Sequence, residues 1–162
     1  MQTRVHHRKS YKMDSILVNK IDALARSRLV TVSADALLVD VAKLLSDTHI
    51  SLVVVCDSHG AMVGVITKTN IVQQIGRSCE SIGTTVASDV MTRNVTSCCP
   101  TDSLLDALSR MEKSGFVHLP VIDEKSKPSG VVNAGDALRA LMAEGKYEAS
   151  LLRNYVMGVG YR

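Results

Sequence analysis

The sequence predicts an α/β (α+β) fold in which tandem β-α-β-β-α repeats pack against each other with pseudo-twofold symmetry. Three observations lead to this prediction: residues 66 positions apart match without a gap, both halves show the same order of strand and helix patterns, and the hydrophobic residues are almost all aliphatic. Hydrophobic residues make up 46% of the 162-residue chain and aromatic residues only 3%. Aliphatic side chains must therefore build the core, which suits short buried strands covered by helices.

The repeat is carried by identical residues that occupy the same place in each half. A β-α-β-β-α unit leaves part of its sheet uncovered, so we expect the two copies to cover each other and form one two-lobed body. Similar residues, such as Asn70 and Asp136, lie between the identical ones. The identical pairs are Leu38 with Leu104, Asp40 with Asp106, Val55 with Val121, Asp57 with Asp123, Gly64 with Gly130 and Val65 with Val131.

Each half begins with a short extended segment, residues 29–33 and 95–99, and continues with a helix whose apolar residues lie on one side. Asp35 in the first half, and Thr101 or Asp102 in the second, are the candidate N-caps of these helices. The apolar stripes consist of Leu37, Leu38, Val41, Leu44 and Leu45 in the first half and of Leu104, Leu105, Leu108 and Met111 in the second.

Two apolar runs separated by turn residues follow in each half, and they predict a pair of strands. The runs are residues 50–56 and 61–66 in the first half and residues 116–122 and 129–132 in the second. A last helix is predicted over residues 69–75 and 135–142.

The chain divides into four parts on this reading. Residues 1–12 form a basic arm that we expect to be disordered, and residues 13–78 contain a leading helix and the first repeat. Residues 79–142 contain a linker and the second repeat, and residues 143–162 form an amphipathic helix and tail. The arm carries four basic residues and no acidic one, whereas the whole chain has a net charge of +3. The folded body is therefore close to neutral, and nucleic acid is an unlikely partner.

The sequence predicts no catalytic residue and no metal site. It contains no P-loop, Gly-x-Ser-x-Gly or His-Glu-x-x-His motif, and its four cysteines lack the spacing of a zinc site. These cysteines, with Cys98 and Cys99 adjacent, indicate buried thiols in a reducing, cytoplasmic setting. No run approaches the ~18 apolar residues that a bilayer requires, so no membrane association is expected.

Four strings resemble segments of the CBS domain family, named for cystathionine β-synthase, over about residues 16–142. They are residues 90–92 (Val-Met-Thr), 118–123 (His-Leu-Pro-Val-Ile-Asp), 130–136 (Gly-Val-Val-Asn-Ala-Gly-Asp) and 64–70 (Gly-Val-Ile-Thr-Lys-Thr-Asn). Together with the repeat, they make the chain similar to a CBS pair, or Bateman module, of the kind found in small stand-alone bacterial CBS-domain proteins.

The resemblance implies a nucleotide cleft between the halves, with AMP, ADP, ATP or NAD as the expected ligand and no catalytic cofactor. In such a cleft, backbone groups of an extended segment read adenine, a carboxylate binds the ribose hydroxyls, and a hydroxyl or amide at a helix start faces phosphate. The residues that the resemblance assigns to the cleft are Thr31, Val32, Ser33, Gly64, Ile66, Thr67, Lys68, Asn70, Ser97, Cys98, Cys99, His118, Pro120, Val132, Asn133 and Asp136.

The halves depart from the family pattern in different ways. The first has Thr67 where the pattern has Thr or Ser, but Asn70 where it has Asp; the second has Asp136 but Asn133 in place of Thr or Ser. Because a carboxylate grips two hydroxyls better than an amide does, the second-half site is expected to be the stronger one.

Three functions remain open at this stage. The favoured one is a nucleotide sensor that acts on an unknown regulated protein and forms a homodimer. The alternative is a ligand-free protein-interaction or dimerisation module, which the departures at Asn70 and Asn133 favour. The third is nucleic-acid binding through the basic arm.

Overall fold

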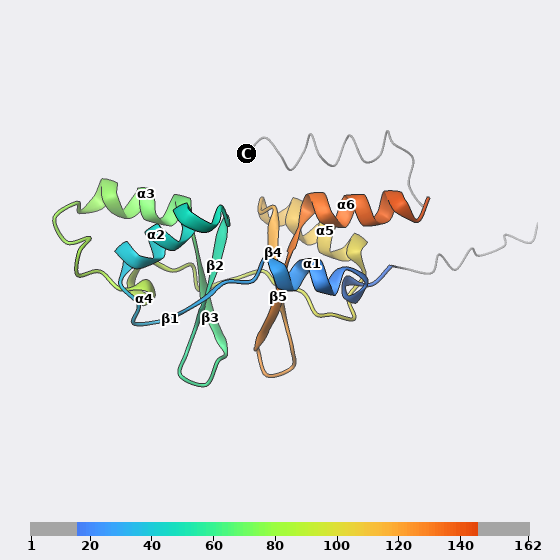
Figure 1. The fold of residues 1–162 in the computed structure, drawn as a ribbon, viewed down its shortest axis with the longest axis horizontal. Coiled ribbons are helices and arrows are strands. Elements are labelled where there is room, and N and C mark those ends of the chain that lie inside the picture. The colour runs from blue at the N-terminus through green and yellow to red at the C-terminus, as the bar shows by residue number, and fades with distance from the viewer. Residues whose placement is uncertain (1–15, 146–162) are drawn as a thin grey trace, which may run out of the picture.

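The computed structural model describes residues 16–145, with the expected β-α-β-β-α order in the first half and its α-β-β-α part in the second (Figure 1). A leading segment contains the 3-10 helix η1 (Val18–Ile21) and helix α1 (Asp22–Ser27). The first half contains β1 (Thr31–Ser33), α2 (Leu38–Thr48), β2 (Leu52–Cys56), β3 (Met62–Thr67) and α3 (Lys68–Arg77). After α4 (Ala87–Val90), the second half contains α5 (Leu104–Ser114), β4 (His118–Ile122), β5 (Pro128–Asn133) and α6 (Ala134–Ala143).

The strand pairing preserves the repeat in detail. In the first half β1 pairs in parallel with β2, which pairs antiparallel with β3; in the second, β4 pairs antiparallel with β5. Val55 lies opposite Gly64 and Val121 lies opposite Gly130, so the 66-residue offset holds across the hairpins. Both hairpins also carry an irregularity directly after that valine. The predicted fold class is therefore confirmed.

The strand predicted over residues 95–99 is wrong, because only Cys98 pairs, in a single parallel bridge with Val121. Its neighbours bond elsewhere: the Ser97 carbonyl accepts from Arg110 at 3.0 Å, and the Cys99 amide donates to Asp102 at 2.9 Å. The two outer bonds of the β1–β2 pairing are donated by the amides of Val54 and Ala34. Their equivalents in the second half are Pro120 and Pro100, which have no N–H to donate, so the ladder cannot extend beyond Cys98. The first-half counterpart forms a strand, but only over residues 31–33.

The helix caps also differ from the prediction. Ser103, rather than Thr101 or Asp102, caps α5 by accepting from the Asp106 amide at 3.0 Å. Leu37 occupies the N-cap position of α2, where its apolar side chain cannot accept a hydrogen bond. Asp35 lies two residues earlier, and its carboxylate accepts from the Ser33 hydroxyl. Cap prediction failed here because several polar residues precede each helix, and only the backbone path decides which of them is in position.

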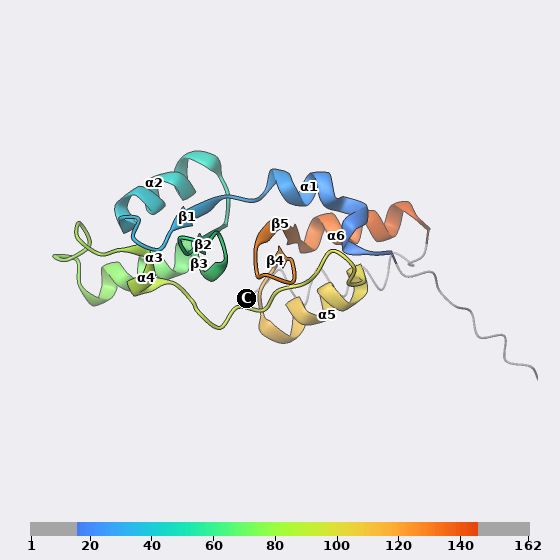
Figure 2. The same cartoon turned by 90° about the horizontal axis from the view of Figure 1, so that it is seen from below.

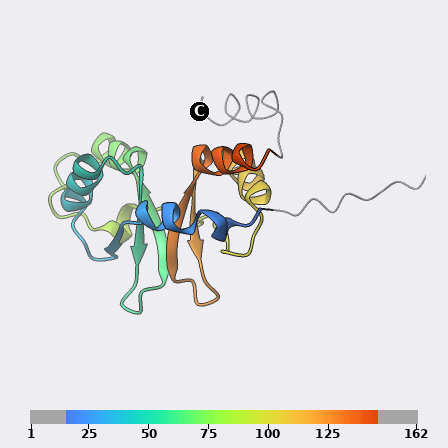
Figure 3. The same ribbon diagram turned by 45° about the vertical axis from the view of Figure 1, so that its right-hand side comes forward.

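Three clusters of buried side chains form the core. One fills the second half around Leu104 and Leu119, and another fills the first half around Leu38 and Ile66. The third lies where the hairpins meet and unites both halves: Leu52, Val54, Val65 and Val131. The two hairpins lie side by side and point away from the helices (Figures 1 and 3). The expected two-lobed body is therefore present.

The leading segment of each half crosses to the hairpin of the other half. Helix α1 lies beside β5 (Figure 2), and an alanine side chain at Gly130 would come within 2.9 Å of Ala25. In the same way, Thr92 exchanges backbone hydrogen bonds of 2.9 and 3.0 Å with Val65, and a side chain at Gly64 would meet Met91 at 2.6 Å. Ala25 and Met91 are equivalent residues of the repeat, so the exchange is reciprocal.

No helix within residues 16–145 is long and apolar enough to cross a bilayer, and no three His, Cys, Asp or Glu residues there could share a metal ion. The prediction of buried thiols is right only for Cys98; Cys56 is half-buried, and Cys79 and Cys99 are exposed. The Cys99 amide is turned toward Asp102, while Cys98 faces the core. The basic arm lies outside the described residues, and so do the predicted C-terminal helix and tail, except for residues 143–145.

Candidate functional site

A cavity of about 490 Å³ lies on the seam between the halves. It is large enough for a small organic ligand, whose sites usually measure ~300–1,000 Å³. Both halves contribute to it: the first through the end of β3 and the start of α3, the second through the loop from α5 to β4. Its lining residues are Ser51, Leu52, Thr67, Lys68, Thr69, Asn70, Gln73, Thr92, Gly115, Phe116, Val117 and His118. None of them is acidic, and Lys68 carries a positive charge. We call this the first cavity.

Asn70 lines the first cavity and forms hydrogen bonds with residues of both halves. Its side-chain oxygen accepts from the amide and the hydroxyl of Thr67, both at 2.9 Å, and thereby closes the first turn of α3. Its amide nitrogen donates to the Thr92 hydroxyl at 3.2 Å and to the Val90 carbonyl at 3.4 Å. Only a side chain that both accepts and donates can make these bonds. The departure from Asp at this position therefore has a structural reason.

A second cavity, of about 310 Å³, occupies the equivalent place in the repeat. Adding 66 to the numbers of its residues 48–52 gives 114–118, of which 115–118 line the first cavity. Its volume is at the lower limit of small-molecule sites. The lining residues are Leu24, Ser27, Arg28, Thr48, His49, Ile50, Ser51, Leu52, His118 and Val131.

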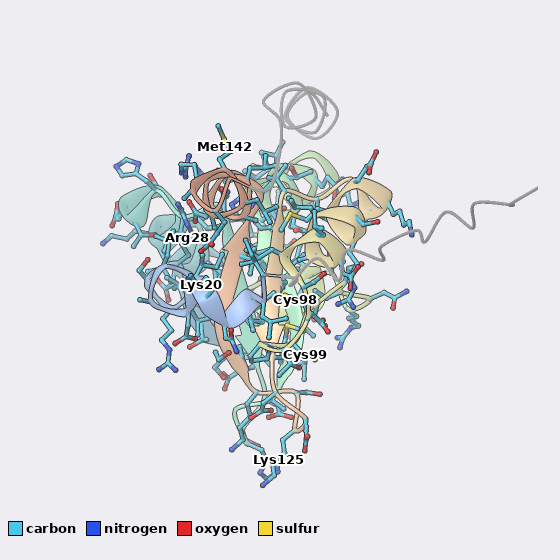
Figure 4. The ribbon with its side chains drawn as sticks, turned by 90° about the vertical axis from the view of Figure 1, so that its right-hand side faces the viewer. Lys20, Arg28, Cys98, Cys99, Lys125 and Met142 are labelled. Atoms are coloured by element: carbon cyan, nitrogen blue, oxygen red, sulfur yellow. The ribbon has the colours of Figure 1, made fainter. Side chains whose placement is uncertain are left out.

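Asp136 lies behind the second cavity rather than on its surface. Its side chain is only 2% exposed, and it forms ion pairs with Arg28, at the end of α1, and with Arg139, one turn along α6. Arg28 binds both carboxylate oxygens, one of them at 3.0 Å, and Arg139 binds at 2.6 Å. Arg28 lies between α1 and α6 (Figure 4). Burial would raise the pKa of the Asp136 carboxyl, but the hydrogen bonds and charges of the two arginines outweigh it and hold that pKa below its ordinary value.

His118 forms part of the wall of both cavities. Its Nε2 lies 3.0 Å from the side-chain nitrogen of Asn133. The Asn133 oxygen caps α6 by accepting from the amides of Gly135 and Asp136, so its nitrogen must face the imidazole as a donor. His118 Nε2 is then an acceptor, as in neutral imidazole. Burial, followed by the charge of Arg28, lowers the His118 pKa against the opposing effect of Asp136.

The lowered pKa of His118 predicts a loss of stability on mild acidification. The unfolded chain takes up this proton near the ordinary pKa of 6.5, before the folded protein does, so the free energy of unfolding falls as the pH drops through that region. His118→Leu, which installs the residue found at Leu52, should make this fall smaller between pH 7 and 5.5 in urea titrations. His59→Leu, at an exposed turn, controls for the removal of a histidine. An unchanged pH dependence in His118→Leu would contradict the prediction.

The residues assigned from the resemblance fall into three groups. Thr67, Lys68, Asn70 and His118 come together around the first cavity. Asn133 and Asp136 lie behind the second cavity, held by His118 and Arg28. The others line neither cavity: Gly64, Ile66, Cys98, Pro120 and Val132 are buried, Ser97 and Val32 are half-buried, and Thr31, Ser33 and Cys99 are exposed. Their assignment as ligand contacts stays a prediction.

The sequence reading missed several residues that line the cavities. Ser51 lies just before β2 in the first half, and Phe116 lies just before β4 in the second. Their equivalents in the repeat are Val117 and Ile50, so the 66-residue offset could have pointed to all four residues. Arg28 carried no signal in the sequence, because its contact with Asp136 spans 108 positions.

A third hollow, of about 630 Å³, is lined by Cys99 and Lys125 near the tip of the β4–β5 hairpin (Figure 4).

The two repeats, of which the second lacks the leading strand, cross to each other's hairpins and form equivalent cavities. They define a two-repeat α/β module. The CBS domain family model matches residues 21–77 and 87–143. The chain therefore belongs to the CBS domain family and contains two CBS domains. Proteins with such pairs are generally regulatory.

The chain is similar to an uncharacterized 17.7 kDa protein of Acidianus ambivalens, with 30% identity over 78% of this chain and 75% of that protein. It is also 25% identical to a homoserine O-acetyltransferase of Methanococcoides burtonii, but the match covers 70% of this chain and only 22% of the enzyme. The chain thus corresponds to about a fifth of that enzyme.

Solved structures show the same fold. A CBS-domain containing protein from Agrobacterium tumefaciens superposes with a TM-score of 0.67 at 27% identity, covering 76% of this chain and 98% of that one. CBSX2 in complex with AMP gives 0.69 at 23% identity, covering 80% and 98%. The CBS domain pair of protein MJ0100, in complex with 5′-methylthioadenosine and S-adenosyl-L-methionine, gives 0.67 at 23%, also covering 80% and 98%.

Proposed function

We propose that this chain is a non-catalytic regulatory module that binds an adenosine-containing nucleotide (AMP, ADP, ATP or NAD) in the first cavity. The observation that carries the proposal is the composition of that cavity, which joins both halves, contains Lys68 and lacks any acidic side chain. The AMP and S-adenosylmethionine complexes of similar CBS pairs support an adenosine compound as the ligand.

The start of α3 is the proposed phosphate position. This ten-residue helix begins at Lys68, and the cavity is lined by the residues of its first turn. Unpaired amides and the positive end of the helix dipole favour an anion there. The Lys68 ammonium adds a charge from the same turn.

Phe116 and Asn70 are the proposed contacts for the rest of the ligand. Phe116 is the chain's single Phe and is 41% exposed beside the cavity, although an aromatic ring of this size is usually buried. A purine stacked on it would cover the ring, which stabilises base binding by ~1–3 kcal/mol. Asn70 lies on the cavity floor, where its neutral contacts with Thr92 and Val90 can be exchanged for ribose hydroxyls.

A ligand in this position would report on the arrangement of the halves. It would contact the α3 start from one half and the α5–β4 loop from the other, so its affinity would differ between lobe arrangements. Homodimer formation, a cytoplasmic location and a regulated partner stay predictions. Exposed apolar side chains on the helices, Val72 and Ile75 on α3 and Met142 on α6, support a dimer through the helical face.

Thermal unfolding with added ligand tests the proposal. A ligand present at 100 times its dissociation constant should stabilise the protein by ~2.7 kcal/mol, which corresponds to a rise in Tm of several degrees. We expect this rise with at least one of AMP, ADP, ATP and NAD. Lys68→Ala should weaken binding of that nucleotide by about three- to tenfold, as expected for loss of one charged contact, and should leave adenosine binding unchanged.

Lys43→Ala is the matched control, because Lys43 is an exposed lysine on α2 that does not line the cavity. No thermal shift with any adenosine compound, S-adenosylmethionine included, would exclude the nucleotide proposal. The ligand-free interaction module would then be the remaining function of the two.

A further inference from the structure

The two cavities occupy equivalent places in the repeat, but their floors are held very differently. In the first, Asn70 meets the leading segment of the other half through two neutral hydrogen bonds of 3.2 and 3.4 Å. In the second, both carboxylate oxygens of Asp136 accept hydrogen bonds from Arg28, which belongs to the leading segment of the first half. A hydrogen bond to a charged group contributes more to stability than one between neutral groups. A ligand can therefore displace the first contact far more easily than the second.

Arg28 has no counterpart in the first cavity. Its equivalent in the repeat is Asn94, which is exposed and is absent from the lining of the first cavity. The Arg28 side chain, by contrast, is 37% exposed and contributes to the wall of the second cavity. The guanidinium group of Arg28 thus lies between the open volume of the second cavity and the Asp136 carboxylate.

The second cavity is consequently unsuited to a nucleoside as it stands. Asp136 accepts bonds from two arginines and is 2% exposed, so ribose hydroxyls cannot reach it. The space that remains, about 310 Å³, is smaller than the 490 Å³ of the first cavity.

We propose that Arg28 is an internal occupant of the second cavity: it holds the Asp136 carboxylate in place of a ribose and restricts the wild-type chain to one nucleotide site. The proposal depends on the proposed function of the first cavity in one respect only, namely the expected number of nucleotide sites in the wild-type chain. It reverses the expectation from the sequence that the Asp136 site is the stronger one.

Calorimetric titration with AMP measures the number of sites. Arg28→Asn installs the residue that the repeat has at position 94 and leaves Asp136 paired with Arg139, whose own side chain is 70% exposed on the solvent side. We expect the number of AMP molecules bound per chain to rise from one in the wild type to two in Arg28→Asn. The double variant Arg28→Asn, Asp136→Ala, which leaves no side-chain acceptor for the ribose hydroxyls, should bind one again.

The matched control is Arg26→Asn, which removes an arginine from the same helix but only an exposed pair with Asp22. It should keep the wild-type count. Arg28→Ala serves as a second variant if the asparagine variant does not fold.

Each outcome is informative. A count that rises from zero to one would uphold the role of Arg28 and overturn the proposed function of the first cavity. An equal count in wild type and both Arg28 variants would overturn the role of Arg28, whatever that count is.

Discussion

Replacing Gly130 with alanine lowers the free energy of unfolding, and we expect a loss of about 1–3 kcal/mol, as for overpacking in a core. The new Cβ would lie 2.9 Å from both the carbonyl carbon and the Cβ of Ala25 and 3.1 Å from its carbonyl oxygen. Two of these atoms belong to the backbone of α1, so no side-chain rotation can relieve the contact. Helix α1 would have to move off β5. Urea unfolding monitored by circular dichroism measures the loss.

Gly76→Ala is the matched control for this substitution. Gly76 lies within α3, and a side chain there would meet nothing within 4 Å. Because alanine favours helix over glycine by up to ~1 kcal/mol, this variant should be as stable as the wild type or more stable. If Gly130→Ala matched it, the close approach of α1 to β5 would be wrong.

Asp136→Ala is expected to lower the free energy of unfolding by about 2–3 kcal/mol through the loss of charged hydrogen bonds. The loss is smaller than for a fully buried pair, because Arg28 and Arg139 are 37% and 70% exposed and can turn to water. It depends on pH. Since the pKa of the Asp136 carboxyl is lowered on folding, its contribution is fully present above the ordinary carboxyl pKa and disappears as the pH falls through the folded value.

The free energies of unfolding of wild type and Asp136→Ala, measured in urea titrations, should therefore differ at pH 7 and become equal in acid. Asp22→Ala is the control, because it removes an exposed pair with Arg26, which stabilises a helix by only ~0.3–0.5 kcal/mol. A pH-independent difference between wild type and Asp136→Ala would show that the ion pairs do not account for it.

The sequence predicted the elements that depend on local periodicity. The stripe from Leu38 to Leu45 defines α2, and the apolar runs on either side of residues 57–60 define a hairpin. The apolar run alone did not predict that residues 95–99 pair only at Cys98. The reason lies in the repeat, because Pro120 and Pro100 stand where the first half has backbone donors.

The candidate site was predictable to a similar extent. The resemblance identified Thr67, Lys68 and Asn70, which do line one cavity. It ranked the cavities by the chemistry of residues 70 and 136 alone. The structure adds a third residue, Arg28, which pairs with Asp136 from the other end of the chain and appears in no motif.

The reciprocal crossing of the leading segments has a consequence for how such a molecule can diversify. A symmetric dimer of single-repeat subunits would have to carry the same side chain at both of its equivalent sites, since one gene would encode both. Joining the two copies in one polypeptide removes that restriction. Here an arginine stands where the other copy has an asparagine, and an aspartate stands where the other copy has an amide. Because the two repeats are fused, the first cavity can bind and release a ligand while the equivalent second cavity stays occupied by Arg28.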